Sequence, residues 1–320
     1  MNTLLSPFPS ADELRIGFIG AGRLGKTLAW SLSQAGLCVR AVASGTPATA
    51  GALAGSIPGC LTVDAQAVVD SCDLVFVTTP DGAIPATAAA LRWRPGMAAV
   101  HCSGVTEVSA LAGASRHGAL VGGFHPMQTF ADPVAAMAAL AGSTITLEAA
   151  EPLMAVLEAL VRRLGCRVNR LPPGMRGRYH AAAGYASQFI NVLFGEASAL
   201  WRSWGATEED ALKALLPMAQ GTLASIASAG IAGGMPGPVS RGDIGSVEKH
   251  VEALMPLGDD TLGLYRQLCA RTVPLALARG GIDAALAQRI LAVLDSPQVR
   301  GLSAPAPGTG AALPLARPEQ

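Results

Sequence analysis

Short apolar runs and helix-like apolar spacings alternate along the first half of the chain. The continuous runs predict buried strands at 14–19, 37–43, 74–78, 98–102, 118–124, 144–147 and 166–171. Between the first two runs, Leu24, Leu28 and Leu32 recur at a spacing of four, which predicts one face of a helix. Strands that alternate with helices predict a parallel sheet covered on both faces, and such a sheet binds ligands at the carboxyl ends of its strands.

Beyond residue 172 the strand pattern ends and helical spacing replaces it. Helices are predicted at 176–204, 207–230, 245–255, 259–279 and 283–294. The fold class that we expect is an α/β Rossmann parallel sheet followed by an all-α C-terminal domain. The predicted organisation is a leader at 1–13, a Rossmann domain at 14–171, a helical substrate and dimerisation domain at 172–295, and a disordered tail at 296–320.

The stretch between Lys213 and Arg241 carries no charge, which raises the question of a membrane span. It contains Pro217, Gly221 and several later glycines, so we do not expect a continuous apolar helix of about 20 residues there. We interpret this stretch as a buried helix followed by a flexible loop, and we expect no membrane association.

Composition excludes several classes of protein. Half of the 320 residues are hydrophobic and 14% are charged, which indicates a large core and argues against disorder. The 23 basic and 23 acidic residues balance, so no excess charge draws the chain to nucleic acid or to an anionic membrane. The six cysteines form no CxxC pair and have no metal-ligand spacing with histidine, which predicts reduced thiols and no metal site. The first residues lack the basic segment and apolar core of a signal peptide, so we expect a cytoplasmic protein.

One glycine motif indicates a dinucleotide site. Gly20-Ala21-Gly22-Arg23-Leu24-Gly25 matches GxGxxG, and it lies directly after a predicted strand and opens an amphipathic helix. Gly20 would permit the tight turn, Gly22 the approach of backbone to a diphosphate, and Gly25 the close packing of helix on strand. The helix N-terminus would add free N–H donors and a partial positive charge.

The residue after the second strand distinguishes NADP from NAD. NAD sites usually carry an acid there, which binds the ribose hydroxyls. Here the position falls at Ser44, and no acid lies between positions 38 and 64. Ser44 and Thr46 could donate hydrogen bonds to a 2′-phosphate, with Arg23 or Arg40 as charge partner. We therefore predict NADP in preference to NAD; the missing acid also argues against a methyltransferase, which is a third interpretation of the glycine loop.

Two further loops at the carboxyl edge of the predicted sheet carry polar residues. Thr78, Thr79 and Pro80 follow one strand, where a loop would pass the riboses of the cofactor. Ser103 follows the next strand, close to the expected nicotinamide. It could bind the carboxamide of the nicotinamide, or it could bind the substrate and take part in catalysis. Ordinary polar turns would account for both loops equally well.

Seven motifs occur in a familiar order: GAGRLG, DLVFVTTPDGAI, HCSG, GGFHPMQTF, YHAAAGYAS, LLPMAQGTL and GPVSRGD. Together they resemble a bacterial family of uncharacterised oxidoreductases that joins a Rossmann-like domain to a helical C-terminal domain of unknown function. The resemblance covers about residues 14–290. It implies an architecture similar to ketopantoate reductase, pyrroline-carboxylate reductase and the β-hydroxyacid dehydrogenases. It also implies a phosphogluconate-dehydrogenase-like helical domain that closes the substrate cleft and often forms the dimer interface.

The resemblance breaks on the first helix of the second domain. The β-hydroxyacid dehydrogenases and ketopantoate reductase carry a lysine there, with an asparagine four residues later, whereas this helix has no lysine. His180 is the titratable group best placed to substitute, and Gly184 occupies the position four residues later. Ser187 is followed by Gln188 where an asparagine is expected, so these two are candidate substrate-binding residues.

Reduction by hydride transfer needs a proton donor beside a polarised C=O or C=N group. His180 is the candidate general acid because the pKa of histidine is ordinarily near neutrality; a structural hydrogen bond is the alternative. His125 could line the cleft together with Gln128 and Thr129, or it could belong to a capped loop turn. Arg241 could bind a substrate carboxylate as a fork, and Asp243 could orient it or only cap the next helix.

The sequence thus predicts an NADP-dependent reductase of a small carbonyl or imine compound, with a carboxylated substrate favoured. The alternative is a non-catalytic dinucleotide-binding protein, either a redox sensor or a scaffold, which the absent lysine favours. The helical domain is rich in Ala, Leu and Gly, and its apolar faces predict a homodimer. The expected partner is a small-molecule substrate.

Overall fold

The computed structural model describes residues 8–296. Residues 1–7 and 297–320 lie outside the described residues, and with them most of the predicted leader and nearly all of the predicted tail. The chain divides into two compact units, one up to Ile190 and one from Asn191. This division falls later than the last strand, so the predicted domain boundary at 171/172 stays a prediction.

The first unit is built on one eight-stranded sheet with the order β3-β2-β1-β4-β5-β6-β7-β8. Its strands are β1 Arg15–Ile19, β2 Cys38–Ala43, β3 Leu61–Thr62, β4 Leu74–Val77, β5 Ala98–His101, β6 Leu120–Pro126, β7 Thr144–Ala149 and β8 Arg167–Arg170. The order of β1 to β6 confirms the predicted Rossmann fold. The prediction of an all-parallel sheet is wrong at one place: β6 and β7 pair antiparallel, because the connection between them turns back instead of crossing over.

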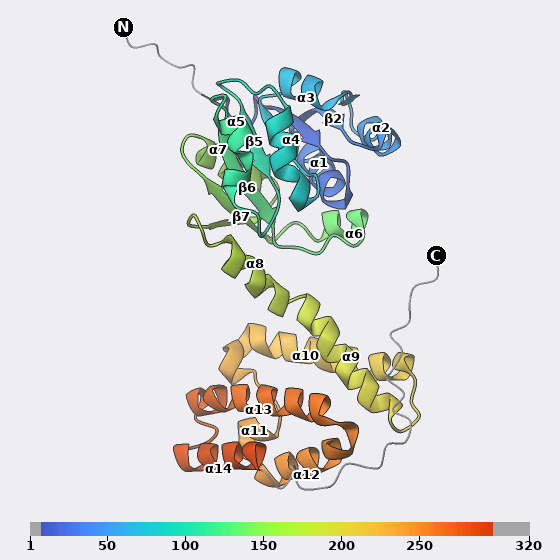
Figure 1. Cartoon of the computed structure of the whole chain (residues 1–320), viewed down its shortest axis with the longest axis vertical. Helices are drawn as coiled ribbons and strands as arrows, with labels where there is room; N and C mark the ends of the chain where they lie inside the picture. The colour runs from blue at the N-terminus through green and yellow to red at the C-terminus, as the bar shows by residue number, and fades with distance from the viewer. Residues whose placement is uncertain (1–7, 297–320) are drawn as a thin grey trace. The chain divides into compact units, whose positions relative to one another are not determined.

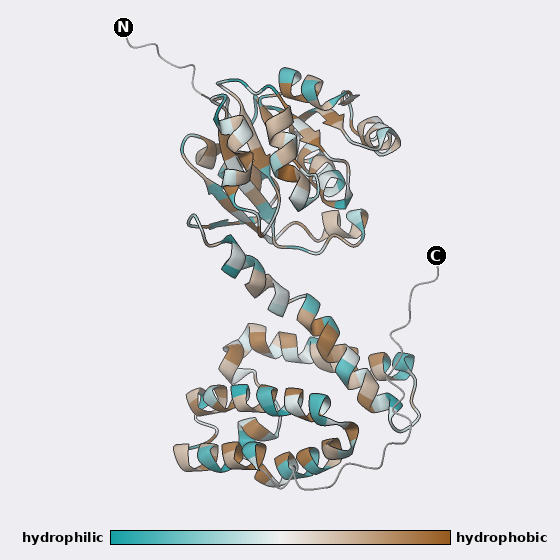
Figure 2. Cartoon of the chain, in the orientation of Figure 1, coloured by the Kyte–Doolittle hydropathy of each residue, from teal (hydrophilic) through white to brown (hydrophobic). Residues whose placement is uncertain are grey.

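Helices cover both faces of this sheet (Figure 1). They are α1 Arg23–Gln34, α2 Pro47–Gly55, α3 Ala65–Ser71, α4 Ile84–Ala90, α5 Ala112–Ser115, α6 Pro133–Ala138 and α7 Leu153–Arg163, with short 3₁₀ turns η1 Asp81–Ala83 and η2 Val108–Leu111. Apolar side chains of α1 and α7 pack on one face, and those of α3, α4 and α5 pack on the other. Figure 2 shows the strands between them coloured as hydrophobic, as expected for strands buried on both sides.

Three phenylalanines mark the core on one face of the sheet. Phe18 of β1 stacks on Phe76 of β4 with ring centroids 5.1 Å apart, and Phe76 meets the edge of Phe124 of β6 at 5.3 Å. All three side chains are fully buried. The packing fixes the relative positions of the central strands, and therefore of the loops that follow them.

The long helix predicted at 176–204 is two helices, α8 Arg176–Tyr185 and α9 Gln188–Arg202. The break follows from the side chains at the junction. Ser187 Oγ donates to the carbonyl oxygen of Ala183 at 2.8 Å, a bond that competes with the helical ladder, and Gly184 lowers the helix propensity beside it.

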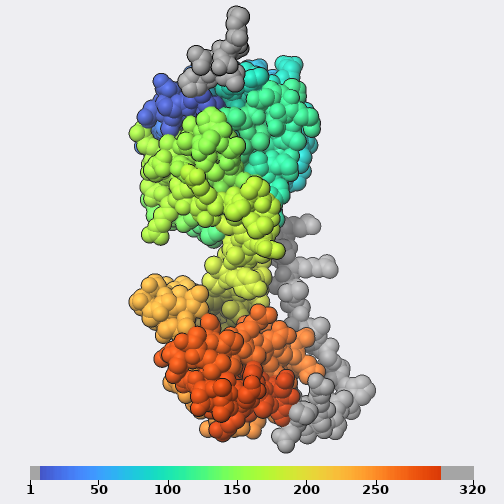
Figure 3. Space-filling view, turned by 90° about the vertical axis from the view of Figure 1, so that its left-hand side faces the viewer, coloured from blue at the N-terminus to red at the C-terminus, as the bar shows by residue number. Residues whose placement is uncertain are grey.

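The described residues of the second unit form helices joined by loops, with no strand. Its elements beyond α9 are α10 Glu208–Gly233, α11 Pro238–Arg241, α12 Ile244–Leu254, η3 Met255–Leu257, α13 Asp259–Arg279 and α14 Ala284–Asp295. Val239, Val247, Leu262 and Ile290 lie in its core and come from four different helices. Figure 3 shows α13 and α14, in orange and red, forming one face of this unit, with the lighter orange α10 segment projecting from it.

Helix α10 corrects the prediction for the uncharged stretch. Instead of a buried helix ending near 230, it is a 26-residue helix that continues to Gly233 past a non-helical Gly230, and its apolar residues are exposed in the single chain. Within residues 8–296 it is the one helix long and apolar enough, by length and composition alone, to cross a membrane. Pro217 lies inside it without ending it, as in the predicted range 207–230.

Candidate functional site

The glycine motif forms a tight turn between β1 and α1. Gly20 adopts a φ of +116°, and a side chain there would lie 2.5 Å from the carbonyl oxygen of Thr78. A Cβ at Gly25 would overlap the carbonyl oxygen of Gly20. Both positions therefore need glycine for the packing of backbone on backbone. Gly22 is the N-cap of α1; its side-chain position is open, and no side chain caps the helix. The amide groups of the first helical turn are thus left free for a ligand.

A cavity of about 700 Å³ lies over this turn. It is lined by Gly20, Ala21, Gly22, Arg23, Leu24, Ser44, Gly45, Thr78, Thr79, Pro80, Thr129, Phe130 and Ala131. Within it, Thr79 Oγ1 is buried and has no hydrogen-bond partner among the described residues. A cavity at the carboxyl ends of β1, β2 and β4, with free helix amides and an unpaired hydroxyl, fits the diphosphate and riboses of a dinucleotide.

Most of the cofactor residues predicted from sequence line this cavity, and three do not. Gly25 packs against the carbonyl oxygen of Gly20 within the turn, Thr46 is the N-cap of α2, and Ser103 lies in another loop. Thr129 was predicted to line the cleft together with His125 and Gln128, whereas Phe130 and Ala131 were not predicted; the signal for these two was their position just after the FHPMQT segment. No Asp or Glu is among the lining residues, which agrees with the absence of an acid after β2.

A polar layer lies between α8 and the carboxyl end of the sheet. His101 of β5, Gly123 of β6 and Glu148 of β7 are cross-strand partners, so their side-chain positions share one face. Two residues further along β6, His125 pairs with Thr146 of β7 on the same face. A helix normally packs on a sheet through apolar side chains, and a polar layer in this place costs free energy. Such a layer is typical of a functional site.

Arg176 enters this layer from the first turn of α8. Its side chain is fully buried; Nε lies 2.6 Å from Oε2 of Glu148, and Nη1 donates to the carbonyl oxygen of Ser103 at 2.8 Å. A Cβ at Gly123 would overlap Nη2, so the guanidinium occupies the space that this glycine leaves. One arginine therefore links α8, the loop after β5 and strand β7.

Two imidazoles meet beside this arginine. His125 and His180 have ring centroids 6.0 Å apart. Gly104 lies between them, since a Cβ there would overlap Cδ2 of His180 and lie 2.9 Å from Nε2 of His125. Nδ1 of His125 is hydrogen-bonded to the hydroxyl of Tyr179 at 2.6 Å. The structure thus brings together His125 and His180, which sequence predicted, with Tyr179, which it missed.

Burial controls the titration of this cluster. Burial, reinforced by His180 and Arg176 and opposed by Asp81, lowers the pKa of His125 to about 4. Burial beside Arg176 likewise lowers the pKa of His101 to about 4. Burial raises the pKa of Tyr179, opposed by a hydrogen bond from Thr146. At neutral pH the imidazoles of His101 and His125 and the phenol of Tyr179 are therefore uncharged.

Ser103 shapes its loop instead of facing a ligand freely. Its hydroxyl donates to Oδ2 of Asp81 at 2.7 Å, and accepts from the backbone amides of Val105 at 3.3 Å and Thr106 at 3.0 Å. A serine hydroxyl has one proton and two lone pairs, so these bonds use its full capacity. The catalytic role of Ser103 stays a prediction. The structure shows the alternative, an ordinary polar turn.

His180, Ser187 and Gln188 line a cavity of about 420 Å³ at the junction of α8 and α9. His180 is exposed, whereas Ser187 is half-buried. Gln128, the other candidate for substrate binding, uses its amide within its own loop: Nε2 donates to Ala139 and Oε1 accepts from Thr129. Its role in substrate binding stays a prediction.

Arg241 and Asp243 lie in the second unit. Arg241 is exposed in the last turn of α11. Asp243 is the N-cap of α12 and accepts from the backbone amide of Ser246 at 3.0 Å and from its hydroxyl at 2.6 Å. Asp243 therefore caps α12, which is the alternative that the sequence left open. Its side chain is hydrogen-bonded to Ser246 and not to Arg241.

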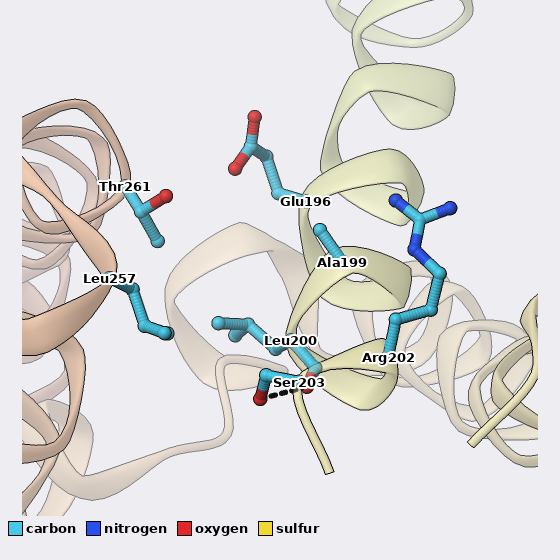
Figure 4. A pocket seen from close by; sticks show the side chains of 7 residues that line it. All are labelled: Glu196, Ala199, Leu200, Arg202, Ser203, Leu257 and Thr261. Carbon is cyan, nitrogen blue, oxygen red and sulfur yellow. Dashed lines mark hydrogen bonds between the residues drawn. The ribbon is translucent and has the colours of Figure 1, made fainter. Parts of the chain in front are cut away.

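A cavity of about 300 Å³ also occurs in the second unit, between α9 and the start of α13 (Figure 4). Leu200 and Leu257 point toward one another across it, while Arg202 points away on the other side of α9. Arg241 and Asp243 do not line it. Among residues 8–296, no group of three or more histidine, cysteine or acidic side chains could hold a metal ion.

Arg176, Tyr179, Glu148 and Asp81 were not among the predicted site residues. Glu148 lies in the strand segment TITLEA, where Thr144, Thr146 and Glu148 alternate with apolar residues. This alternation is the signal in the sequence that the three polar side chains share one face of the strand. Arg176, Tyr179 and His180 share one helix face through their spacing of three and four. That pattern became informative only once the helix was placed on the sheet.

Two family models match the chain. Residues 15–101 match the model described as NADP oxidoreductase coenzyme F420-dependent, and residues 143–272 match the domain of unknown function DUF2520. A search of curated proteins finds no match.

Solved structures resemble most of the chain at low identity. A Bacteroides fragilis protein, provisionally described as an NADP oxidoreductase, is 24% identical over 83% of this chain and 100% of its own, with a TM-score of 0.65. An Aspergillus terreus reductive aminase in complex with NADPH and ethyl-5-oxohexanoate is 16% identical over 90% and 94%, with a TM-score of 0.56. A pyrroline-5-carboxylate reductase from Coxiella burnetii is 16% identical over 87% and 98%, with a TM-score of 0.54.

These likenesses confirm the two-part fold and the resemblance that the motifs predict. Residues 15–101 are thus similar to the NADP oxidoreductase coenzyme F420-dependent family, and residues 143–272 to the DUF2520 family.

Proposed function

We propose that this protein is an NADP-dependent oxidoreductase that reduces a small carbonyl or imine compound. The observation that carries the proposal is the presence, in one unit, of an open glycine turn with free helix amides and a partly exposed pair of imidazoles. Both lie at the carboxyl edge of one sheet, where Rossmann folds bind cofactor and substrate. The similarity of residues 15–101 to the NADP oxidoreductase family and the NADPH complex of the reductive aminase support NADP as the cofactor.

When bound, the reduced nicotinamide would supply a hydride to the carbonyl or imine carbon. The free amides of α1 and the hydroxyl of Thr79 would hold its diphosphate and ribose. At the end of β2, Ser44 would meet a 2′-phosphate without the charge repulsion that a carboxylate would cause.

The exposed His180 is the proposed proton donor. It would transfer a proton to the oxygen or nitrogen that gains negative charge as the carbon accepts the hydride. Its exposure lets it regain a proton from solvent, unlike the buried His101. The assignment of Arg241 to a substrate carboxylate is kept as part of the proposal, because its guanidinium is exposed and has no ion pair among the described residues.

NADPH consumption tests the proposal directly. Purified protein is mixed with NADPH and a panel of 2-oxo acids, ketones and cyclic imines, and absorbance of the reduced nicotinamide is followed. We expect turnover with at least one carbonyl or imine and loss of turnover in His180→Ala. NADPH binding without turnover of any compound would favour the alternative, a redox sensor or scaffold.

We further propose that the protein is a homodimer through its helical unit. Apolar side chains of α10 are exposed in the single chain, including Met218, Leu223 and Ile231 at 65%, 56% and 66%. Val192 of α9 is exposed in the same way. A soluble helix rarely leaves such a face uncovered, and a second copy is the partner that every molecule of this protein has available.

We propose a cytoplasmic location for it. All six cysteines are free, and several are buried or half-buried, which is common in a reducing compartment.

A further inference from the structure

Polar side chains lead to His125 from the edge of the sheet. Nδ2 of Asn169 donates to Oγ1 of Thr146 at 3.0 Å. A side-chain interaction with Thr146 lowers the pKa of Tyr179, and the hydroxyl of Tyr179 lies 2.6 Å from Nδ1 of His125. These residues lie on β8, β7, α8 and β6, so the fold itself sets their geometry.

The direction of the bond between Tyr179 and His125 follows from the phenol proton. Among the described residues, Nδ1 of His125 is the acceptor that lies within hydrogen-bond distance of the Tyr179 hydroxyl. The neutral phenol therefore donates its proton to Nδ1 of His125. A nitrogen that accepts a hydrogen bond carries no proton, so a neutral His125 carries its proton on Nε2.

The surroundings of His125 favour this neutral form. From α8 it faces Arg176, whose positive charge disfavours an imidazolium, and His180, which adds to this effect when it carries a proton; from β5 it has the buried His101 nearby. Asp81 of η1 is the one charged neighbour that favours the imidazolium, and its carboxylate is engaged with Ser103. The described residues give Nε2 no hydrogen-bond partner, and the ring is partly exposed.

Position 104 leaves space beside Nε2. A side chain there would come within 2.9 Å of this nitrogen and would overlap His180. The space between the two imidazoles thus depends on a glycine, and it is the place where a small polar group can reach both rings.

We propose that Tyr179 is a positioning residue that fixes His125 as the neutral Nε2–H tautomer, so that His125 donates a hydrogen bond to the substrate group being reduced. The hydrogen bond to the substrate rests on the proposed function, whereas the tautomer of His125 does not. It divides the work between the two histidines: Nε2–H of His125 polarises the C=O or C=N group, and His180 supplies the proton. A neutral imidazole that only donates a hydrogen bond needs no change of charge during the reaction.

Side-chain ¹⁵N NMR of the full chain without cofactor or substrate tests the tautomer. Two-bond ¹H–¹⁵N spectra distinguish Nε2–H, Nδ1–H and imidazolium forms, and His125→Asn identifies the signals of His125. We expect the Nε2–H form of His125 throughout pH 5.5–8. In Tyr179→Phe we expect a loss of this preference, with the Nδ1–H form appearing, and a rise in the pKa of His125, because a donor to the neutral ring is gone.

Tyr185→Phe is the matched control, since Tyr185 lies on the same helix and is 71% exposed; we expect no change in the His125 signals. Tyr179→Leu likewise removes the hydroxyl that faces Nδ1 of His125, and should shift the tautomer in the same direction if Tyr179→Phe proves too unstable to measure. An Nδ1–H form or an imidazolium at pH 7 in the unmodified protein would overturn the proposal. So would an unchanged Nε2–H preference in both variants.

The NMR result stands apart from the proposed function. Failure to bind NADPH would remove the reductase but leave the tautomer, whereas a wrong tautomer would remove the role of Tyr179 and leave the reductase. If a substrate is found, His125→Ala should lower kcat roughly 100-fold, as removal of one such donor does elsewhere. His125→Gln keeps an N–H donor and should retain more of the activity than His125→Ala.

Discussion

Nε of Arg176 lies 2.6 Å from Oε2 of Glu148, and the pair joins the first helix after the sheet to a strand near its edge. The arginine side chain is fully buried and that of Glu148 is 10% exposed. Because the same guanidinium also binds the carbonyl of Ser103, the pair positions the loop after β5 and the helix that carries Tyr179 and His180. The position of Tyr179 and His180 therefore depends on an ion pair whose two residues line none of the cavities described above.

Removing one partner of this pair should destabilise the protein strongly. Arg176→Met leaves the carboxylate of Glu148 buried without its charge partner, and such losses cost about 3–5 kcal/mol. Replacing both, as Arg176→Met with Glu148→Leu, should recover much of the loss because no unpaired charge remains. Urea denaturation of the two variants measures this. Equal destabilisation in the single and double variants would contradict a direct pair.

Gly123→Ala should destabilise the first unit, because its Cβ would overlap Nη2 of Arg176. Overpacking of this kind costs about 1–3 kcal/mol. Gly51→Ala is the control: it lies within α2, has open space at its Cβ position, and should be neutral or slightly stabilising. Thermal unfolding of both variants checks this; a Gly123→Ala variant as stable as Gly51→Ala would mean that Arg176 does not occupy the space.

Ser44→Asp should weaken NADPH binding more than NADH binding. Ser44 lines the cavity at the end of β2, where an acid binds ribose hydroxyls and repels a 2′-phosphate. A loss of about tenfold in NADPH affinity corresponds to 1.4 kcal/mol. Ser109→Asp, at an exposed serine of η2, adds the same charge elsewhere and should change neither affinity. Equal effects on the two cofactors would place the 2′-phosphate away from Ser44.

Stability should fall as the pH is lowered from 6.5 toward 4 through the buried histidines. The pKa of His125 is about 4 in the folded protein against an ordinary 6.5, so below pH 6.5 the unfolded chain binds a proton that the folded chain does not. The His125→Asn variant has no imidazole at this position, so it lacks this difference in proton binding between the folded and the unfolded chain. The stability advantage of the unmodified protein over the variant should therefore be full above pH 6.5 and shrink toward pH 4. A pH-independent difference in urea midpoint would indicate a His125 that titrates normally.

Leu223→Glu should separate the proposed dimer. Leu223 is exposed on α10 in the single chain, so the charge costs nothing unless another copy covers the position. Light scattering should give the mass of two chains for the unmodified protein and of one chain for the variant. Ala285→Glu, at an exposed position of α14, should remain dimeric. A single-chain mass for the unmodified protein would reject the dimer.

The sheet and the glycine turn could be predicted from sequence because their signals are local. Continuous apolar runs marked the strands that became β1, β2, β4 and β5, and GxGxxG needed only its neighbours. The polar layer could not be predicted, since it depends on the register of three strands. Only the pairing of Gly123 with His101 and Glu148 shows that an arginine from α8 can fit there.

The burial of helix α10 was misjudged for a different reason. Its predicted range, 207–230, is close to the observed Glu208–Gly233. An uncharged, apolar sequence predicts a buried helix, whereas the single chain leaves the apolar side chains of this helix exposed.

Calorimetric titration of NADPH into the unmodified protein and Gly22→Val tests the central claim most directly. The side-chain position of Gly22 has no protein atom within 4 Å, and its backbone is extended at φ −73° and ψ −174°, so valine should leave the fold intact while filling the space proposed for the diphosphate. We predict saturable binding of NADPH, tighter than NADH, that is lost in the variant with no change in circular dichroism. Absence of NADPH binding, or binding that survives Gly22→Val, would contradict the account.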